Sequence, residues 1–158
     1  MSLARTVDQY LGQAKVRYDL LDHPHTANSQ DTARAARLPG KRVAKAVILR
    51  DRRDGRSMMA VLPATNRINF RWLRDEFNLD LEMVKEPALR DLFPDCEAGA
   101  VPPLGPAYHL MTLWDESLDR EPEVYFEAGD HEHLLRLPHQ EFEKVFEGLP
   151  HGVFSSEH

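Results

Sequence analysis

Lys45 is the first residue whose type and position could do chemistry. It lies in the apolar run Val-Ala-Lys-Ala-Val-Ile-Leu at residues 43–49, which is rich in β-branched residues and predicts a strand. Alternate side chains of a strand point to the same face, so Lys45 would share a face with Val43 and Val47. A lysine in such a row either extends its ammonium group to water at the strand end or reaches into a cavity for an anion. Taken alone, the pattern favours the first arrangement.

Two His-x-His pairs, His23 with His25 and His131 with His133, are the next candidates. On a strand, side chains two residues apart share a face, so either pair could give two ligands to a metal ion. A zinc site needs a further ligand, and no Cys-x-x-Cys or His-Glu-x-x-His motif provides it. The simpler alternative is a polar turn at the first pair and hydrogen bonding at the second. Glu127 could be a base or a carboxylate at the edge of the core.

The segment Gly-Ala-Val-Pro-Pro-Leu-Gly at residues 99–105 carries no side chain that can act as acid, base, nucleophile or metal ligand. Proline fixes φ at about −65° and has no N–H, whereas glycine adopts backbone shapes that other residues resist. The segment therefore predicts a rigid loop with exposed main-chain groups. If this loop lines a pocket, the pocket recognises its ligand through backbone N–H and C=O groups.

Other nucleophile chemistry has little support in the sequence. No serine lies in a Gly-x-Ser-x-Gly motif, and there is no glycine-rich phosphate loop. Cys96 is the only cysteine, and its acidic neighbours Asp95 and Glu97 would raise the pKa of the thiol, so we expect a structural role. Thr26 and Asn28 lie in a polar loop, where they could bind a substrate amino group or simply close the turn.

The charge is unevenly distributed along the 158 residues. The formal net charge of −6 argues against a general nucleic-acid coat. Basic residues nevertheless crowd one segment: Arg34, Arg37, Lys41, Arg42, Lys45, Arg50, Arg52, Arg53 and Arg56, followed by Arg67, Arg71 and Arg74. These residues could form a local basic face for a polyanion, or they could be neutralised in intramolecular ion pairs. Composition alone favours the ion pairs.

These residues must be positioned by a mixed set of elements. Apolar periodicity and capping residues predict helices over residues 2–15, 29–36, 69–77, 87–93 and from Pro138 onward. Strands are predicted over 17–22, 43–49, 58–62, 79–84, 109–114, 123–127 and 133–137, with hairpin turns at 54–55 and 129–130. The pattern indicates an α+β fold in one domain spanning residues 1–158. Without a membrane-length apolar run, a signal peptide or a cysteine pair, the sequence fits the cytoplasm.

Four motifs in fixed order give the chain a family resemblance. They are the run around Lys45, Val-Leu-Pro-Ala at 61–64, the loop at 99–105 and Val-Tyr-Phe-Glu-Ala-Gly at 124–129. Their order and spacing, from about residue 23 to residue 146, resemble the YbaK/prolyl-tRNA-synthetase-associated domain family. Members of that family are free-standing or inserted editing domains that hydrolyse mischarged aminoacyl-tRNA.

The resemblance implies a fold and a role for particular residues. The fold is a mixed, partly rolled β-sheet flanked by helices. Lys45 would contact the terminal adenosine region of tRNA. Gly99 and Pro103 match a Gly-x-x-x-Pro loop whose backbone positions the ester and the attacking water. Within this loop, Ala100, Val101 and Pro102 are expected to contact the substrate. Some family members use a histidine near the late glycine-containing turn, and His131 is preferred to His133 for that position. Gly129 in that turn, and Thr26 and Asn28 from their polar loop, complete the set of candidate substrate-binding residues.

The resulting hypothesis is a trans-acting aminoacyl-tRNA deacylase for small amino acids. It would act on the 3′ end of tRNA without a metal or other cofactor, alone or docked on an aminoacyl-tRNA synthetase. Nothing in the sequence requires more than a monomer. Two alternatives stay open: a non-catalytic module that binds tRNA or a nucleotide, and a metal-dependent hydrolase using His131, His133 and a carboxylate such as Glu127.

Overall fold

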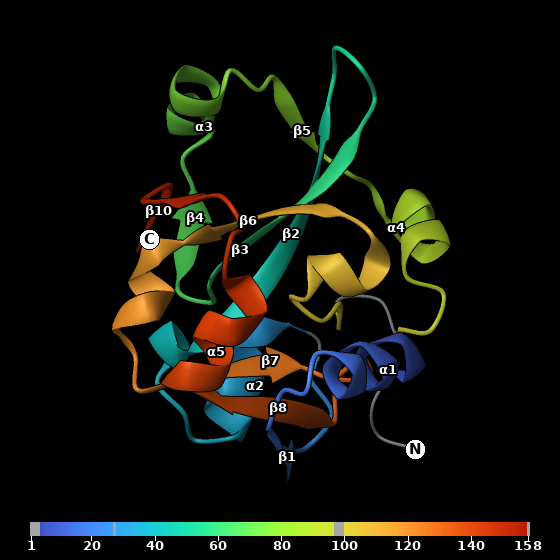
Figure 1. Cartoon of the computed structure of the whole chain (residues 1–158), viewed down its shortest axis with the longest axis vertical. Helices are drawn as coiled ribbons and strands as arrows, with labels where there is room; N and C mark the ends of the chain where they lie inside the picture. The colour runs from blue at the N-terminus through green and yellow to red at the C-terminus, as the bar shows by residue number, and fades with distance from the viewer. Residues whose placement is uncertain (1–3, 27, 97–99, 158) are drawn as a thin grey trace.

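The computed structural model describes residues 4–26, 28–96 and 100–157 (Figure 1). Within them the chain forms five α-helices: α1 (Arg5–Gln13), α2 (Ser29–Ala35), α3 (Phe70–Phe77), α4 (Glu86–Leu92) and α5 (His139–Phe146). The described strands are β1 (Asp19–Asp22), β2 (Val43–Asp51), β3 (Ser57–Pro63), β4 (Asn66–Ile68), β5 (Leu81–Met83), β6 (Met111–Asp115), β7 (Glu123–Glu127), β8 (His133–Pro138), β9 (His151–Gly152) and β10 (Ser155–Glu157). Short 3-10 helices η1 (Gly40–Arg42), η2 (Gly105–Tyr108) and η3 (Glu116–Arg120) connect them.

A mixed sheet organises the molecule. Its strands follow the order β1-β8-β7-β2-β3-β6-β9, and β5 pairs with β2 beside this path. The β1–β8, β7–β8, β2–β3 and β2–β5 pairs are antiparallel, whereas β2–β7, β3–β6 and β6–β9 are parallel. A separate two-stranded sheet joins β10 to β4. Because parallel neighbours need long crossovers, the sheet brings together segments far apart in the sequence.

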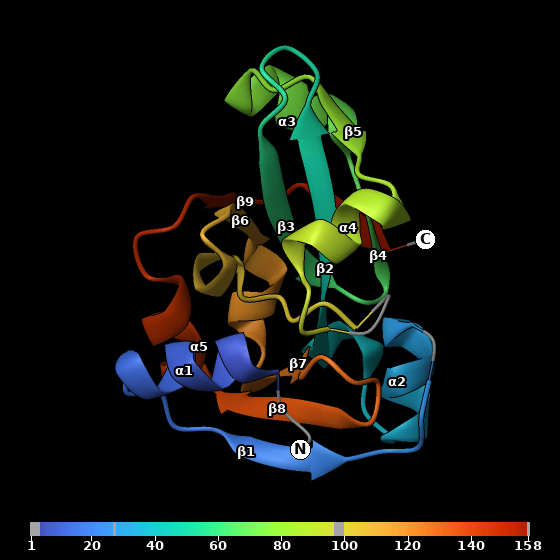
Figure 2. The same ribbon diagram turned by 90° about the vertical axis from the view of Figure 1, so that its right-hand side faces the viewer.

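Helices cover both faces of the sheet, and the alternation along β2 shows why. Ala44 and Ile48 belong to the core cluster that α1 and α5 cover. Val43 and Leu49 point to the opposite face, where α2 and α3 respectively contribute to the packing. Figure 2 shows α1 and α5 on one side of β2 and α2 on the other. The predicted α+β fold with a mixed sheet flanked by helices is confirmed, including the two faces of the strand around Lys45.

Some element boundaries differ from the prediction for local reasons. The strand expected from His109 begins at Met111, because η2 precedes it and His109 ends η2 in the left-handed region with φ of 58°. Pro138 is the N-cap of α5 rather than its first residue. The short strands β4, β9 and β10 were not predicted, since runs of two or three residues have no readable period.

Two ladders determine where the polar residues of interest meet. β1 pairs with β8, and β8 pairs with β7, so the segment after β1 lies beside the turn that joins β7 to β8. β7 in turn lies parallel to the start of β2. Across the residues that the structure describes, no helix has the length and apolar character needed to cross a membrane.

Candidate functional site

The segment after β1 is tied to the turn after β7 by main-chain hydrogen bonds. The backbone N–H of His23 donates to the carbonyl of Glu132 at 2.8 Å, and that of Thr26 donates to the carbonyl of His131 at 3.3 Å. The rings of His25 and His131 pack edge to face, with centroids 5.5 Å apart. The fold therefore brings the two His-x-His motifs together, although more than a hundred residues separate them.

A buried polar cluster lies between these segments and α2. His23, Thr32, Glu127 and His131 are 7%, 0%, 3% and 3% exposed. The hydroxyl of Thr32 donates to Glu127 Oε1 at 2.7 Å, and the hydroxyls of Thr32 and Thr26 are 2.6 Å apart. Burial raises the pKa of Glu127, while the Thr32 hydrogen bond and the charges of His23 and His131 oppose that shift. The cluster thus contains a carboxyl group whose ionised form is disfavoured by burial.

The second histidine pair divides into two environments. His131 is buried, with φ of 60°. His133 lies nearer the surface, with Nδ1 2.6 Å from Asp130 and Nε2 3.0 Å from Asp22. Both ring nitrogens of His133 are therefore occupied by carboxylates. His131, and not His133, joins the buried cluster.

The metal-dependent alternative receives no geometric support from this pair. In the described part of the chain, the side chains spaced to share a metal ion are Asp119, His139 and Glu143, whose ligand atoms lie within 4.8 Å of one another. They belong to η3 and α5, away from the histidine pairs. His139 already pairs there with both carboxylates.

Gly129 occupies a position that only glycine fits. Its φ is 112°, and a Cβ built on it would lie 2.9 Å from the Ala4 Cβ and 3.5 Å from the Cys96 sulfur. The neighbouring Ala128 carbonyl accepts a 2.8 Å hydrogen bond from the Ala4 N–H. The turn after β7 therefore packs tightly against the start of α1 and against Cys96.

The segment expected to be an exposed loop is largely buried in its described part. Gly99 lies outside the described residues. Ala100, Pro102, Pro103 and Leu104 are buried, and Val101 is partly buried against the core. The Leu104 N–H donates to the Pro102 carbonyl at 2.7 Å, and later carbonyls are used within η2. The expectation of exposed main-chain groups throughout is wrong, because the prolines pack into the core. Within this segment, the main-chain groups of Ala100, Val101 and Pro103 make no hydrogen bond with any described residue.

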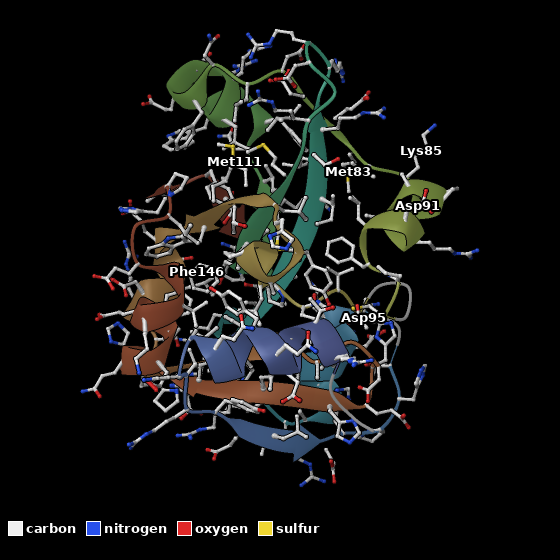
Figure 3. The ribbon with its side chains drawn as sticks, turned by 45° about the vertical axis from the view of Figure 1, so that its right-hand side comes forward. Met83, Lys85, Asp91, Asp95, Met111 and Phe146 are labelled. Carbon is white, nitrogen blue, oxygen red and sulfur yellow. The ribbon has the colours of Figure 1, made fainter. Side chains whose placement is uncertain are left out.

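Cys96 fixes the base of this segment. Its sulfur lies 3.2 Å from the Tyr108 hydroxyl, which donates to Asp95 at 3.1 Å. Asp95 also accepts the Thr6 N–H at 2.9 Å, and Figure 3 shows Asp95 between α4 and α1. Burial raises the pKa of the Cys96 thiol to about 12. The geometry agrees with a structural cysteine, because a thiol with this pKa is not a nucleophile near neutral pH.

Lys45 is half-buried and has no acidic partner among the described residues. Burial lowers the pKa of its ammonium group, and the charge of Arg67 lowers it further. The parallel ladder pairs Val43 with Tyr125 and Ala44 with Phe126, so Lys45 and Glu127 follow at adjacent positions on one face. The lysine thus lies on the same side of the sheet as the buried cluster. Its ammonium group is of a type that can bind an anion.

Thr26 and Asn28 differ in their surroundings. Asn28 is exposed and caps α2: its side chain accepts the Asp31 N–H at 2.9 Å and donates to the Asp31 carboxylate at 2.9 Å. Asn28 therefore closes the turn, as one of the two alternatives held. Thr26 contacts the buried cluster through Thr32.

Most of the basic segment is neutralised by ion pairs. Arg34, Arg42, Arg50, Arg52, Arg53 and Arg56 each pair with a nearby carboxylate. Within the described part of the chain, the cations of this region without an acidic partner are Arg37, Lys41, Lys45, Arg67 and Arg71. Ion pairs therefore account for most of the basic segment, as composition favoured, and Arg67 is close enough to Lys45 for the two charges to interact.

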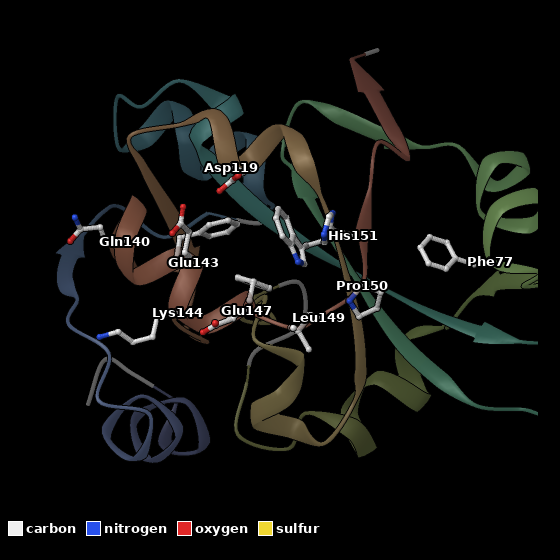
Figure 4. A pocket seen from close by; sticks show the side chains of 13 residues that line it. Phe77, Asp119, Gln140, Glu143, Lys144, Glu147, Leu149, Pro150 and His151 are labelled. Atoms are coloured by element: carbon white, nitrogen blue, oxygen red, sulfur yellow. The ribbon is translucent and has the colours of Figure 1, made fainter.

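Two surface hollows lie away from these residues. One, of about 1000 Å³, is formed by α5 and the segment before β9 and is lined by Trp114, Phe146 and His151 (Figure 4). Another, of about 510 Å³, lies between α3 and β5. Neither includes Lys45, Thr26 or His131. The candidate site rests on its polar geometry and not on a large cavity.

Sequence reasoning missed part of the cluster. Thr32 carries no motif, and its buried position follows only from the packing of α2 on the sheet. The presence of two His-x-His pairs was a usable signal for His23, although it suggested metal ligands. Lys45, Thr26, Glu127, Gly129 and His131 were all singled out from the sequence.

Comparison with known proteins places this chain in a family. The family model for the aminoacyl-tRNA editing domain matches residues 23–145, and the chain belongs to that family. The resemblance drawn from the four motifs is confirmed. None of the curated proteins matches the chain.

Solved structures share the fold at low identity. A hypothetical protein is 19% identical with a TM-score of 0.83, covering 96% of this chain and 100% of its own. A candidate trans-editing enzyme for prolyl-tRNA synthetase is 21% identical with a TM-score of 0.78, covering 97% and 96%. A candidate signal transduction protein from Marinobacter aquaeolei VT8 is 18% identical with a TM-score of 0.74, and this chain covers only 30% of it. At these identities the likeness establishes the fold alone.

Proposed function

We propose that this protein is a trans-acting aminoacyl-tRNA deacylase that removes small amino acids from mischarged tRNA. The observation that carries the proposal is the half-buried Lys45, which has no acidic partner among the described residues. It lies on the same sheet face as the Thr32–Glu127 cluster, within the editing-domain match. The similarity to a candidate trans-editing enzyme for prolyl-tRNA synthetase supports the same activity.

The chemistry needs little from the protein. The oxygen of a water molecule attacks the ester carbonyl carbon, and the bond to the terminal ribose oxygen breaks. That oxygen takes up a proton, which leaves the free amino acid and an uncharged tRNA. Because an aminoacyl ester is already activated, orientation and charge stabilisation suffice, and no protein nucleophile is needed. The vicinal ribose hydroxyl assists the proton transfer.

Each site residue has a proposed part in this reaction. Lys45 holds a phosphate next to the terminal adenosine, where partial burial strengthens the attraction. The main-chain groups of Ala100 and Val101, which make no hydrogen bond with the described residues, orient the ester and the water together with those of Gly99, Pro102 and Pro103. His131 and Gly129 form the opposite side of the proposed substrate site. No step requires a metal or other cofactor.

The proposed partner is the single-stranded 3′ end of tRNA. Such ends are recognised by stacking and by a few phosphate contacts and not by groove readout. Lys45 and the nearby Arg67, which have no acidic partner in the part of the chain that the structure describes, suit this mode of binding. Recognition of the tRNA body could come from this chain alone or from a synthetase on which it docks.

The test is deacylation of tRNA charged with alanine, serine or cysteine by the purified protein and by Lys45→Ala. We expect turnover of at least one substrate and a loss of about 10- to 100-fold in kcat/KM for the variant, because a hydrogen-bonded charge is removed. Lys144→Ala is the matched control, since Lys144 pairs with Glu141 on α5 and should leave the rate unchanged.

Two outcomes would contradict the proposal. The absence of turnover on every charged tRNA at micromolar enzyme would exclude a deacylase of this specificity. Binding of uncharged tRNA without hydrolysis of any ester would point instead to a non-catalytic binding module.

A further inference from the structure

The hydroxyl groups of Thr26 and Thr32 form a chain that ends on Glu127. Thr32 Oγ1 lies 2.7 Å from Glu127 Oε1 and 2.6 Å from Thr26 Oγ1. Thr32 is fully buried and Glu127 is 3% exposed, whereas Thr26 is only half-buried. The chain therefore leads from a buried carboxyl group to the hydroxyl of a residue that is partly exposed to solvent.

The direction of the chain follows from the chemistry of its end. An ionised carboxylate only accepts hydrogen bonds, so the single hydroxyl hydrogen of Thr32 is committed to Glu127. The short Thr26–Thr32 contact then requires Thr26 to donate to Thr32. Its own hydrogen is used, and the Thr26 oxygen can offer only lone pairs to a ligand. A group that binds there must be a hydrogen-bond donor.

Inside the cluster, the Glu127 carboxylate is influenced by the charges of His23 and His131. Glu127 Oε2 is buried and makes no hydrogen bond with the described residues, and the same holds for His23 Nε2. No lysine or arginine pairs with Glu127 among these residues. The negative charge therefore acts through the two hydroxyls, which favours a cationic donor at Thr26.

We infer that Thr26 accepts a hydrogen bond from the α-ammonium group of the aminoacyl substrate, with Thr32 and Glu127 as positioning residues. The inference rests on the proposed function, because an aminoacyl ester offers one cationic donor, its α-ammonium, beside the reacting carbonyl. Thr26 also donates its backbone N–H to the His131 carbonyl. The amino group of the substrate is thereby fixed next to the turn that carries His131 and Gly129.

Binding of two non-hydrolysable analogues separates this inference from catalysis. The first is 3′-deoxy-3′-(L-alanylamino)adenosine, and the second is its 3′-propionylamino counterpart, which lacks only the amino group. Titration calorimetry should show that the protein binds the alanyl analogue at least about tenfold more tightly, the usual worth of a charged hydrogen bond.

Variants test each link of the chain. Thr26→Val and Glu127→Gln should bring the ratio of the two affinities close to one, while Thr26→Ser, which keeps the hydroxyl, should restore it. Glu141→Gln is the matched control, because Glu141 is also a buried carboxylate but lies on α5, where it accepts the Arg17 N–H and contacts Lys144. That variant should keep the ratio of the unmodified protein.

Each result decides one of the two proposals. Equal affinity for both analogues, no binding of the alanyl analogue at millimolar concentration, or an unchanged ratio in Glu127→Gln would overturn the inference. Deacylation with equal affinities would leave the proposed function standing without it. Preference for the alanyl analogue without hydrolysis of any charged tRNA would support amino-group recognition and refute the deacylase.

Discussion

At the scale of single residues, the candidate site places a lysine and a carboxyl group on one face of the sheet. Lys45 has a lowered pKa because burial disfavours its charge, and Glu127 has a raised pKa for the same reason. Each is therefore more stable when a ligand of opposite charge replaces the lost water. An aminoacyl-tRNA end carries both: a phosphate and an ammonium group.

The lowered pKa of Lys45 predicts a pH dependence of tRNA binding. The phosphate contact needs the protonated amine. As the pH rises, affinity for uncharged tRNA should therefore begin to fall at a pH below the ordinary lysine pKa of about 10.4. In Lys45→Arg the guanidinium stays charged, and this loss should disappear. Fluorescence anisotropy between about pH 7 and pH 10 measures both proteins, and parallel pH profiles would contradict the assignment.

At the scale of elements, the predictable part of the fold is the part with local periodicity. The two-residue alternation of β2 correctly separates Ala44 and Ile48 from Val43 and Leu49. Strands β4 and β10 are three residues long and pair across 89 positions, so no local pattern marks them. The same limit applies to the site, since the proximity of Thr26 to His131 is created by the β1–β8 ladder.

Gly105 at the start of η2 gives an element-scale prediction. A Cβ at this position would lie 1.8 Å from the Thr112 hydroxyl oxygen and 3.1 Å from the Thr112 Cβ. Thr112 is buried and donates to the Leu110 carbonyl, so it cannot rotate away without losing that bond. Gly105→Ala should lower the free energy of unfolding by about 1–3 kcal/mol.

Gly12 in α1 is the matched control, because a Cβ at this position would meet nothing within 4 Å. Gly12→Ala should raise the free energy of unfolding by about 0.5–1 kcal/mol, since alanine favours a helix. Urea denaturation of both variants measures the two changes. Equal effects of the two substitutions would show that the close packing around Gly105 is not the cause.

At the scale of the whole molecule, nearby carboxylates neutralise most of the positive charge of the basic segment. The net charge is −6, and ion pairs neutralise most arginines of the basic segment. What remains around Lys45 is a small positive area that includes Arg67 on β4. Binding of tRNA should accordingly depend on few phosphate contacts.

Salt dependence of tRNA binding measures those contacts. Each phosphate contact with a single strand contributes about 0.7 to the slope of log K against log salt. Arg67→Ala should reduce the slope by about that amount. Arg56→Ala removes an arginine that is paired with Asp54 and should leave the slope unchanged. A larger loss in the second variant would place the tRNA on the β2–β3 hairpin instead.

The pairing of β1 with β8 has a consequence for synthesis of the chain. Asp19 pairs with Arg136, 117 residues later. Contacts of such separation close slowly and cannot form until the later strand has left the ribosome. Thr26 and Thr32 are made well before Glu127 and His131. A nascent chain therefore lacks the proposed amino-group site until the segment after β7 has been made and has folded against them.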